Sequence, residues 1–175
     1  MKKFELTNEF IVDISGVKLF RIKALIEFGN VKAGDLGGYI EKEENLSHMG
    51  NAWVSGNARV SGDAQVFGNA WVSGNARVSG DAQVFGDARV SGDAQVFGDA
   101  RVSGDKDYAY AHGFGSCNRT TTFFRLKDGD VGVRCGCFYG TLAQFRDNVC
   151  ETHGETKKAQ EYLMLADLMD FRFKN

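Results

Sequence analysis

Three sets of side chains in this sequence have the types and spacing to carry chemistry. The first lies toward the C-terminus, where Cys135-Gly-Cys137 and Cys150-Glu-Thr-His153 supply three thiols and an imidazole. Thiolate and imidazole ligands in a tetrahedron suit Zn²⁺. A Cys-x-Cys spacing is tighter than the usual Cys-x-x-Cys, however, and packed free thiols are the simpler interpretation. We therefore expect no cofactor, and we keep zinc at Cys135, Cys137, Cys150 and His153 as the alternative.

The histidines form the second set. His48 falls at a position that valine occupies elsewhere in a repeat, so we expect it to be a buried structural residue. His112 lies in the segment just past the last repeat. The sequence has no phosphate-binding loop, no serine nucleophile elbow and no paired-carboxylate pattern.

The third set is periodic, because Arg59 and Arg77 lie eighteen residues apart. Two stacked guanidinium groups could hold a phosphate. The alternative is a solvated face whose charge is balanced by nearby aspartates. Which of the two applies depends on the elements that position these arginines.

The eighteen-residue period is built from a six-residue unit, Ala-x-Val-x-Gly-(Asn/Asp). Valine recurs at every sixth position from 54 to 102, and alanine and glycine keep the same spacing. Alanine and valine lie two apart, so they point to the same side of a strand, and the glycine allows a sharp corner. Three units per turn predict a three-sided coil whose copies stack about 4.8 Å apart. A helix is excluded, because a period of six does not return to one helix face.

The outward positions give each side of this coil its own character. One side carries Trp53 and Trp71 followed by Arg89. A second side carries Arg59 and Arg77, with Phe97 at its end. The third side carries Phe67 and Phe85. Exposed aromatic ladders usually mark interfaces, so we expect these eight residues to bind a ligand or partner, with self-association into a trimer as the first candidate.

The repeat resembles the hexapeptide pattern of the trimeric acyltransferases with a left-handed parallel β-helix. Val54-Ser-Gly-Asn-Ala-Arg59 and its successors carry this resemblance, which implies the handedness. It also implies acyl-CoA as substrate and a catalytic histidine between subunits; His112, which could face a neighbouring subunit, is then the candidate for the general base. About four coils without an inserted loop provide little surface against which a pantetheine arm could pack, however. The chain also resembles prophage-encoded hexapeptide-repeat proteins through GDLGGYIEKEENLSH, GCFYGTLAQF and ETHGETKKAQEYL.

The ends of the chain depart from the repeat and predict a three-part organisation. Residues 1–33 alternate as strands with a turn at Ser15-Gly16 and should form a β-hairpin cap. Residues 34–107 form the β-helix of about four eighteen-residue coils. Residues 108–175 begin with a glycine-rich crossover and continue as a ββαα domain. Its hairpin is predicted over 120–126 and 131–138, with one helix from a capping box at Thr141 to about Cys150 and a second over 155–171.

Composition narrows the class of function. The net charge is −2 and no basic block stands out, so the composition does not favour nucleic-acid binding. No apolar run suggests a signal peptide or membrane span, so we expect a cytosolic protein. The resemblance to prophage-encoded proteins implies that the cytosol is that of a bacterial host. The resemblance to prophage proteins favours a non-catalytic, homo-oligomeric binding or inhibitor protein. It would occupy a host protein or sequester a nucleotide-like signal, as counter-defence proteins do. The alternatives are an acyl-CoA-dependent acyltransferase and a purely structural oligomerisation module.

Overall fold

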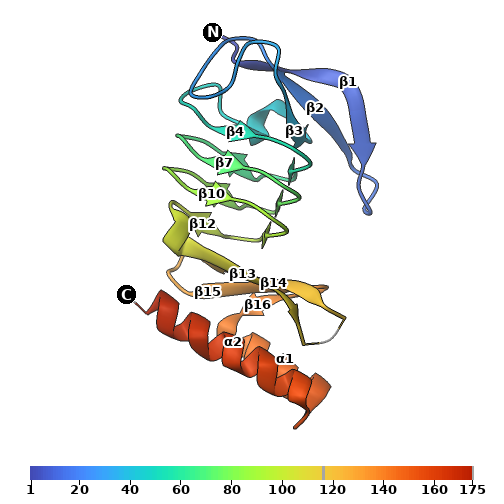
Figure 1. Ribbon diagram of the computed structural model, residues 1–175, viewed down its shortest axis with the longest axis vertical. Coiled ribbons are helices and arrows are strands. Elements are labelled where there is room, and N and C mark those ends of the chain that lie inside the picture. Colours follow the sequence, from blue (N-terminus) through green and yellow to red (C-terminus); the bar gives the residue numbers. More distant parts are fainter. Residues whose placement is uncertain (116, 175) are drawn as a thin grey trace.

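The six-residue unit folds into a three-sided β-solenoid, as the periodicity predicts (Figure 1). The computed structural model describes residues 1–115 and 117–174. Four strands stack on one side, and three stack on each of the other two sides, all in parallel. These strands are β3 (Leu36–Ile40), β5 (Arg59–Val60), β8 (Arg77–Val78) and β11 (Gln95–Val96); β4 (Trp53–Val54), β7 (Trp71–Val72) and β10 (Arg89–Val90); and β6 (Gln65–Val66), β9 (Gln83–Val84) and β12 (Arg101–Val102).

The interior of the solenoid is made of the repeated alanines and valines. Every alanine from Ala52 to Ala100 and every valine from Val54 to Val102 in the six-residue beat is fully buried. Each corner glycine from Gly50 to Gly98 has a φ between 62° and 72°, the left-handed region that a side chain disfavours. A Cβ on Gly74 would also lie 2.9 Å from the nitrogen of Gly92 in the next coil, so glycine is required by both conformation and space.

The solenoid has three rows of corners, and along two of them the side chains of successive coils are joined by hydrogen bonds. Asn57 donates to Asn75, and Asn75 donates to Asp93 at 3.1 Å. The second ladder runs in the same way from Asn51 through Asn69 to Asp87. An aspartate can only accept, so each ladder of amides ends in an aspartate at its C-terminal step.

Both ends of the solenoid are closed by polar side chains that satisfy the backbone groups of the terminal coils. At the N-terminal end, the Lys3 ammonium donates to the Ala52 carbonyl at 2.8 Å, and the Asn45 amide donates to the Ala64 carbonyl at 2.8 Å. At the C-terminal end, Asp105 accepts from the Arg89 amide, and Thr122 accepts from the Gln95 amide, both at 2.9 Å. Donors therefore cap one end and acceptors cap the other, which prevents these ends from pairing with other chains.

The N-terminal segment forms a hairpin that extends one side of the solenoid. β1 (Phe4–Val12) pairs with β2 (Lys18–Ala24), and β2 pairs antiparallel with β3. The base of the hairpin caps the core as predicted, because Phe4, Ile22 and Ala24 join the buried cluster of the solenoid. Its tip instead bends along the side of the solenoid toward the C-terminal region (Figure 1).

The C-terminal region contains a four-stranded antiparallel sheet covered by two helices. Its strands are β13 (Tyr108–Phe114), β14 (Arg119–Arg125), β15 (Val131–Cys135) and β16 (Phe138–Thr141). The predicted hairpin and the Thr141–Gln144 capping box are confirmed, and α1 (Leu142–His153) and α2 (Lys157–Phe173) follow. The prediction of only two strands is wrong. The aromatic crossover is itself a strand, because its backbone pairs with β14, and β16 adds a further edge.

Candidate functional site

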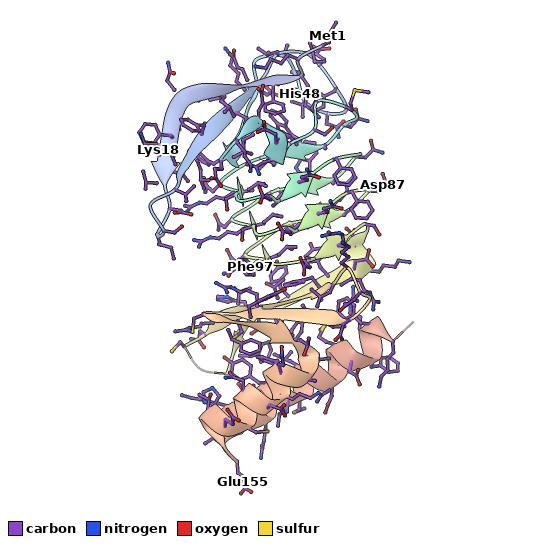
Figure 2. All side chains as sticks on the ribbon, turned by 180° about the vertical axis from the view of Figure 1, so that it is seen from behind. Met1, Lys18, His48, Asp87, Phe97 and Glu155 are labelled. Carbon is purple, nitrogen blue, oxygen red and sulfur yellow. The ribbon has the colours of Figure 1, made fainter. Side chains whose placement is uncertain are left out.

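The most promising site is a cleft that all three parts of the chain build together. Its cavity of about 170 Å³ is lined by the hairpin tip, the side of the solenoid that carries the arginine ladder, and the C-terminal sheet. The residues of this arginine cleft are Asp13, Ile14, Leu19, Arg59, Ser61, Arg77, Ser79, Gln95, Val96, Phe97 and Arg134. Figure 2 shows Phe97 where the last coil meets the C-terminal sheet, with the hairpin on the same flank of the molecule.

Arg59 and Arg77 lie side by side in the cleft because β5 and β8 pair in register. Like charges directly opposite one another on neighbouring strands destabilise a sheet. Within the described residues, neither guanidinium forms an ion pair with a carboxylate. The sheet therefore holds two adjacent positive charges that no side chain neutralises by direct contact.

The third arginine comes from the C-terminal sheet. The Arg134 guanidinium lies over the Phe97 ring, 4.8 Å from its centre, and the Tyr139 ring packs against Phe97 at 76°, with ring centres 5.0 Å apart. Stacking on Phe97 restricts the position of the Arg134 side chain. Sequence reasoning missed Arg134 because it lies outside the repeat, and no local pattern indicates that β15 reaches this side of the solenoid.

Asp13 is the one carboxylate among the residues that line the cleft. It accepts hydrogen bonds from the Ser15 hydroxyl, the Ser15 amide and the Val17 amide, which shape the hairpin turn. The Ser15 hydroxyl, the Val17 amide and, more weakly, the charge of Arg59 lower the pKa of Asp13. Asp13 is therefore ionised at neutral pH and offsets part of the charge of the three arginines.

A larger and more open hollow of about 620 Å³ lies at the N-terminal end of the third side, beside Glu43, His48 and Phe67. Glu43, one of the two carboxylates that line it, already has partners, because it lies 2.8 Å from the Lys2 ammonium and 3.3 Å from the His48 ring. The hydrogen bond from Lys2 lowers the pKa of Glu43. We favour the smaller cleft because its arginines lack such partners.

The aromatic ladders stack as predicted, but they are not equally exposed. Trp53 pairs in register with Trp71, yet Trp53 is only 2% exposed because the Phe28 ring packs against it at 5.3 Å. The prediction of an exposed tryptophan pair is therefore wrong for Trp53. Trp71 remains half-buried, with its indole donating to Ser55. Phe67 and Phe85 stack face to face, with ring centres 5.1 Å apart.

Arg89 follows Trp71 in the same stack of strands and is exposed. A cation–π contact between the two would be possible, because Arg89 follows the tryptophans on that side. In the part of the chain that the structure describes, Arg89 is not placed over an aromatic ring. It lies near Tyr108 and Arg172, away from the arginine cleft.

The predicted zinc ligands do not converge. The Cys135 thiol accepts from the Thr121 hydroxyl at 3.2 Å and faces Tyr162, whereas Cys137 and Cys150 are exposed. His153 packs on the Tyr162 ring. Over residues 1–115 and 117–174, no three His, Cys, Asp or Glu side chains are arranged to hold a metal ion. Cys135 turns into the layer between sheet and helices, so the pair Cys135 and Cys137 does not point to a common centre.

The histidines have structural contacts. The His112 ring nitrogen Nδ1 lies 2.9 Å from the Thr120 hydroxyl on the exposed face of β13. His48 is half-buried rather than fully buried. Its ring stacks on Phe4 at 4.3 Å, and its Nδ1 accepts from the Lys3 amide. Neither histidine lines the arginine cleft.

Comparison with known proteins supports the solenoid. Five overlapping stretches, residues 52–68, 64–80, 70–84, 82–96 and 94–105, match the family model described as the YdcK beta solenoid repeat. No curated protein matches the chain. The matched stretches cover the central coils, so neither the hairpin nor the helices are part of the match. Among the described residues, no helix has the length and apolar character to cross a membrane.

Proposed function

We propose that the protein is a non-catalytic binding protein that holds a small phosphate-bearing ligand of the nucleotide type in the arginine cleft. The observation that carries this proposal is the approach of Arg59, Arg77 and Arg134 to one cavity without ion-pair partners among the described residues. Guanidinium groups bind phosphate oxygens through pairs of parallel hydrogen bonds. A bound anion would also relieve the repulsion between Arg59 and Arg77.

The remaining wall of the cleft suits the same ligand. The hydroxyls of Ser61 and Ser79 stand beside the arginines and can donate to phosphate oxygens. The apolar side chains of Ile14 and Leu19 also line the cleft; Leu19 is buried, whereas Ile14 is 99% exposed at the hairpin tip.

The size of the cleft indicates how the ligand lies. Its volume of about 170 Å³ is below the roughly 300 Å³ at which pockets for whole small molecules begin. We infer that the cleft takes the phosphate groups and that the rest of the ligand extends along the outer face of the solenoid. The resemblance to prophage proteins supports sequestration of a host signalling nucleotide as the biological role.

A thermal-shift series tests this proposal. Wild-type protein is heated with 1 mM inorganic pyrophosphate, ADP, a cyclic dinucleotide or acetyl-CoA. A ligand present at one hundred times its Kd stabilises the folded state by about 2.7 kcal/mol, which raises Tm by roughly 5–10 °C for a chain of this size. We expect such a rise with at least one of the three phosphate probes other than acetyl-CoA.

The matched variants are Arg77→Gln in the cleft and Arg89→Gln on another side. Loss of one charged hydrogen-bond donor costs about 1.5–3 kcal/mol of binding, so Arg77→Gln should weaken binding about 10- to 150-fold. Arg89→Gln should bind as wild type does. The proposal is overturned if no phosphate probe raises Tm, or if the two variants respond equally. A response to acetyl-CoA alone that His112→Ala abolishes would favour the acyltransferase instead.

A further inference from the structure

A second hollow borders the pair Arg59 and Arg77 on the side away from the arginine cleft. Its cavity of about 340 Å³ is lined by Asn57, Arg59, Asn75, Arg77 and Asp93, so the two arginines line both cavities. In each of their coils, the corner asparagine comes two residues before the arginine, and the serine of the cleft comes two residues after it. The two cavities therefore lie on opposite sides of the arginines. We call the second one the corner hollow.

The corner hollow contains a row of exposed polar groups that hydrogen bonds hold in one orientation. Asn57 donates to Asn75 at 3.4 Å, and Asn75 donates to Oδ1 of Asp93 at 3.1 Å. Among the described residues, the other carboxylate oxygen of Asp93, Oδ2, accepts no hydrogen bond, and Asp93 forms no ion pair. Each amide nitrogen also has a second N–H beyond the one that the row uses. The row therefore has an acceptor and donors left for a ligand.

The Asp93 carboxylate limits which part of a ligand can lie in the corner hollow. A carboxylate can only accept hydrogen bonds, and it repels a phosphate. It suits a neutral group that donates hydrogen bonds and lies next to the phosphates in the same molecule. The neighbouring hydroxyls of a ribose are such a group, and dinucleotide-binding folds hold them with an acidic side chain.

We propose that the ligand of the arginine cleft is a ribonucleotide with free 2′ and 3′ hydroxyls, whose ribose lies in the corner hollow. This inference rests on the proposed function and gives a place to the part of the ligand that the cleft is too small to hold. The ribose hydroxyls donate to Oδ2 of Asp93 and accept from the free N–H of Asn75, while Arg59 and Arg77 hold the phosphates. A cyclic dinucleotide suits the site less well, because its phosphodiesters use one hydroxyl of each ribose.

A neighbouring corner of the solenoid provides a matched control for Asp93. There, Asn69 donates to Asp87 at 3.0 Å, in the same kind of row. The outward residues that follow this corner are Trp71 and Arg89, so it borders one arginine instead of a stacked pair. Figure 2 shows Asp87 on the side of the molecule away from the hairpin. A variant at Asp87 therefore makes the same chemical change in a row that lies away from the arginine cleft.

Isothermal titration calorimetry with ADP and 2′,3′-dideoxy-ADP tests the inference on the wild-type protein. The two probes carry the same phosphates and the same base, and they differ only in the ribose hydroxyls. Loss of the hydrogen bonds to a carboxylate should weaken binding of the dideoxy probe about 10- to 150-fold relative to ADP. Inorganic pyrophosphate, titrated in parallel, measures binding in the arginine cleft alone.

The variants Asp93→Asn and Asp87→Asn separate a ligand contact from a structural role. Asparagine keeps an oxygen that can accept from the preceding amide, so both variants should show the circular dichroism spectrum of wild type. Asp93→Asn should weaken ADP binding about tenfold or more, because a neutral acceptor replaces a charged one. It should bind pyrophosphate at least as tightly as wild type does, because a repulsive charge is removed. Asp87→Asn should bind both probes as wild type does.

The two levels of the account fail in different ways. If neither pyrophosphate nor ADP binds, the proposed function falls and the inference falls with it. If pyrophosphate binds but ADP binds no more tightly than dideoxy-ADP, the ribose does not lie in the corner hollow, while the arginine cleft remains a phosphate site. Equal effects of Asp93→Asn and Asp87→Asn on ADP, or an equal loss of ADP and pyrophosphate binding in Asp93→Asn, would also overturn the inference.

Discussion

Lys3 places an ammonium group inside the N-terminal end of the solenoid. Its side chain is 1% exposed, donates to the carbonyls of Ala52 and Gly50, and lies 4.7 Å from the centre of the Phe28 ring. Burial lowers the pKa of Lys3 from 10.5 to about 8. The same residue therefore caps the first coil and couples the stability of the fold to pH.

The first prediction is that wild type gains stability over Lys3→Met as the pH rises above 8. Below pH 8, both the native and the unfolded Lys3 carry a proton. Between about pH 8 and 10.5, the unfolded chain binds a proton that the native state has lost, so the free energy of unfolding rises by up to about 1.4 kcal/mol per pH unit. Urea denaturation of both proteins at pH 7.5, 8.5 and 9.5 measures the difference. If the free energies of unfolding of the two proteins differ by the same amount at all three pH values, the pKa of Lys3 is not lowered as described.

The second prediction separates the two tryptophans, which are equivalent in the repeat and different in the structure. Trp53→Ala should cost about 3–5 kcal/mol because it empties a buried site beneath Phe28. Trp71→Ala should cost clearly less, because that side chain is only partly buried. If chemical denaturation shows the same loss of unfolding free energy for both variants, Phe28 does not cover Trp53 as the structure shows.

At the scale of the elements, the sequence predicts the coils well because every coil is built from the same six-residue unit. Alanine and valine two apart, followed by glycine, determine both the inward face and the corner of every unit. The terminal elements follow no such rule. β13 looks like a glycine-rich connection, and only its pairing with β14 makes it a strand. Trp53 looks exposed, because Phe28, which covers it, lies outside the periodic segment.

The third prediction concerns the insertion of repeat units. The core positions of all units are alike, so a second copy of residues 70–75 inserted after Asn75 should leave the β-structure and a cooperative unfolding transition intact. The six-residue insertion moves Arg77 to the next side of the solenoid, however, and separates it from Arg59. Stabilisation by the phosphate probe identified with wild type should then be lost.

A second copy of residues 70–87 is the matched control, because a full coil returns every later residue to its own side. It keeps Arg59 and Arg77 on one face and places a second copy of Arg77 beside them, while the last coil with Phe97 and the C-terminal sheet with Arg134 move away by one coil, about 4.8 Å. This variant should retain part of the thermal shift. Equal binding by the two insertion variants would contradict a site built on the arginine ladder.

At the scale of the whole molecule, the candidate site depends on the meeting of three segments that are far apart in sequence. The periodicity predicts the pairing of Arg59 with Arg77 and the neighbouring serines. It cannot predict the walls, because Ile14 comes from a hairpin that bends along the solenoid and Arg134 from a sheet beyond it. The candidate zinc ligands show the opposite case. Cys135, Cys137, Cys150 and His153 lie near one another in the sequence, but the fold does not bring them together among the described residues.

The most direct test of the central claim is a nuclear magnetic resonance titration of the arginine side chains with inorganic pyrophosphate. The Nε–Hε resonances of Arg59, Arg77 and Arg134 should shift together and saturate with one dissociation constant, while those of Arg89 and Arg101 stay in place. Resonances that do not move, or that move equally for all arginines, would show that the cleft does not bind phosphate as proposed.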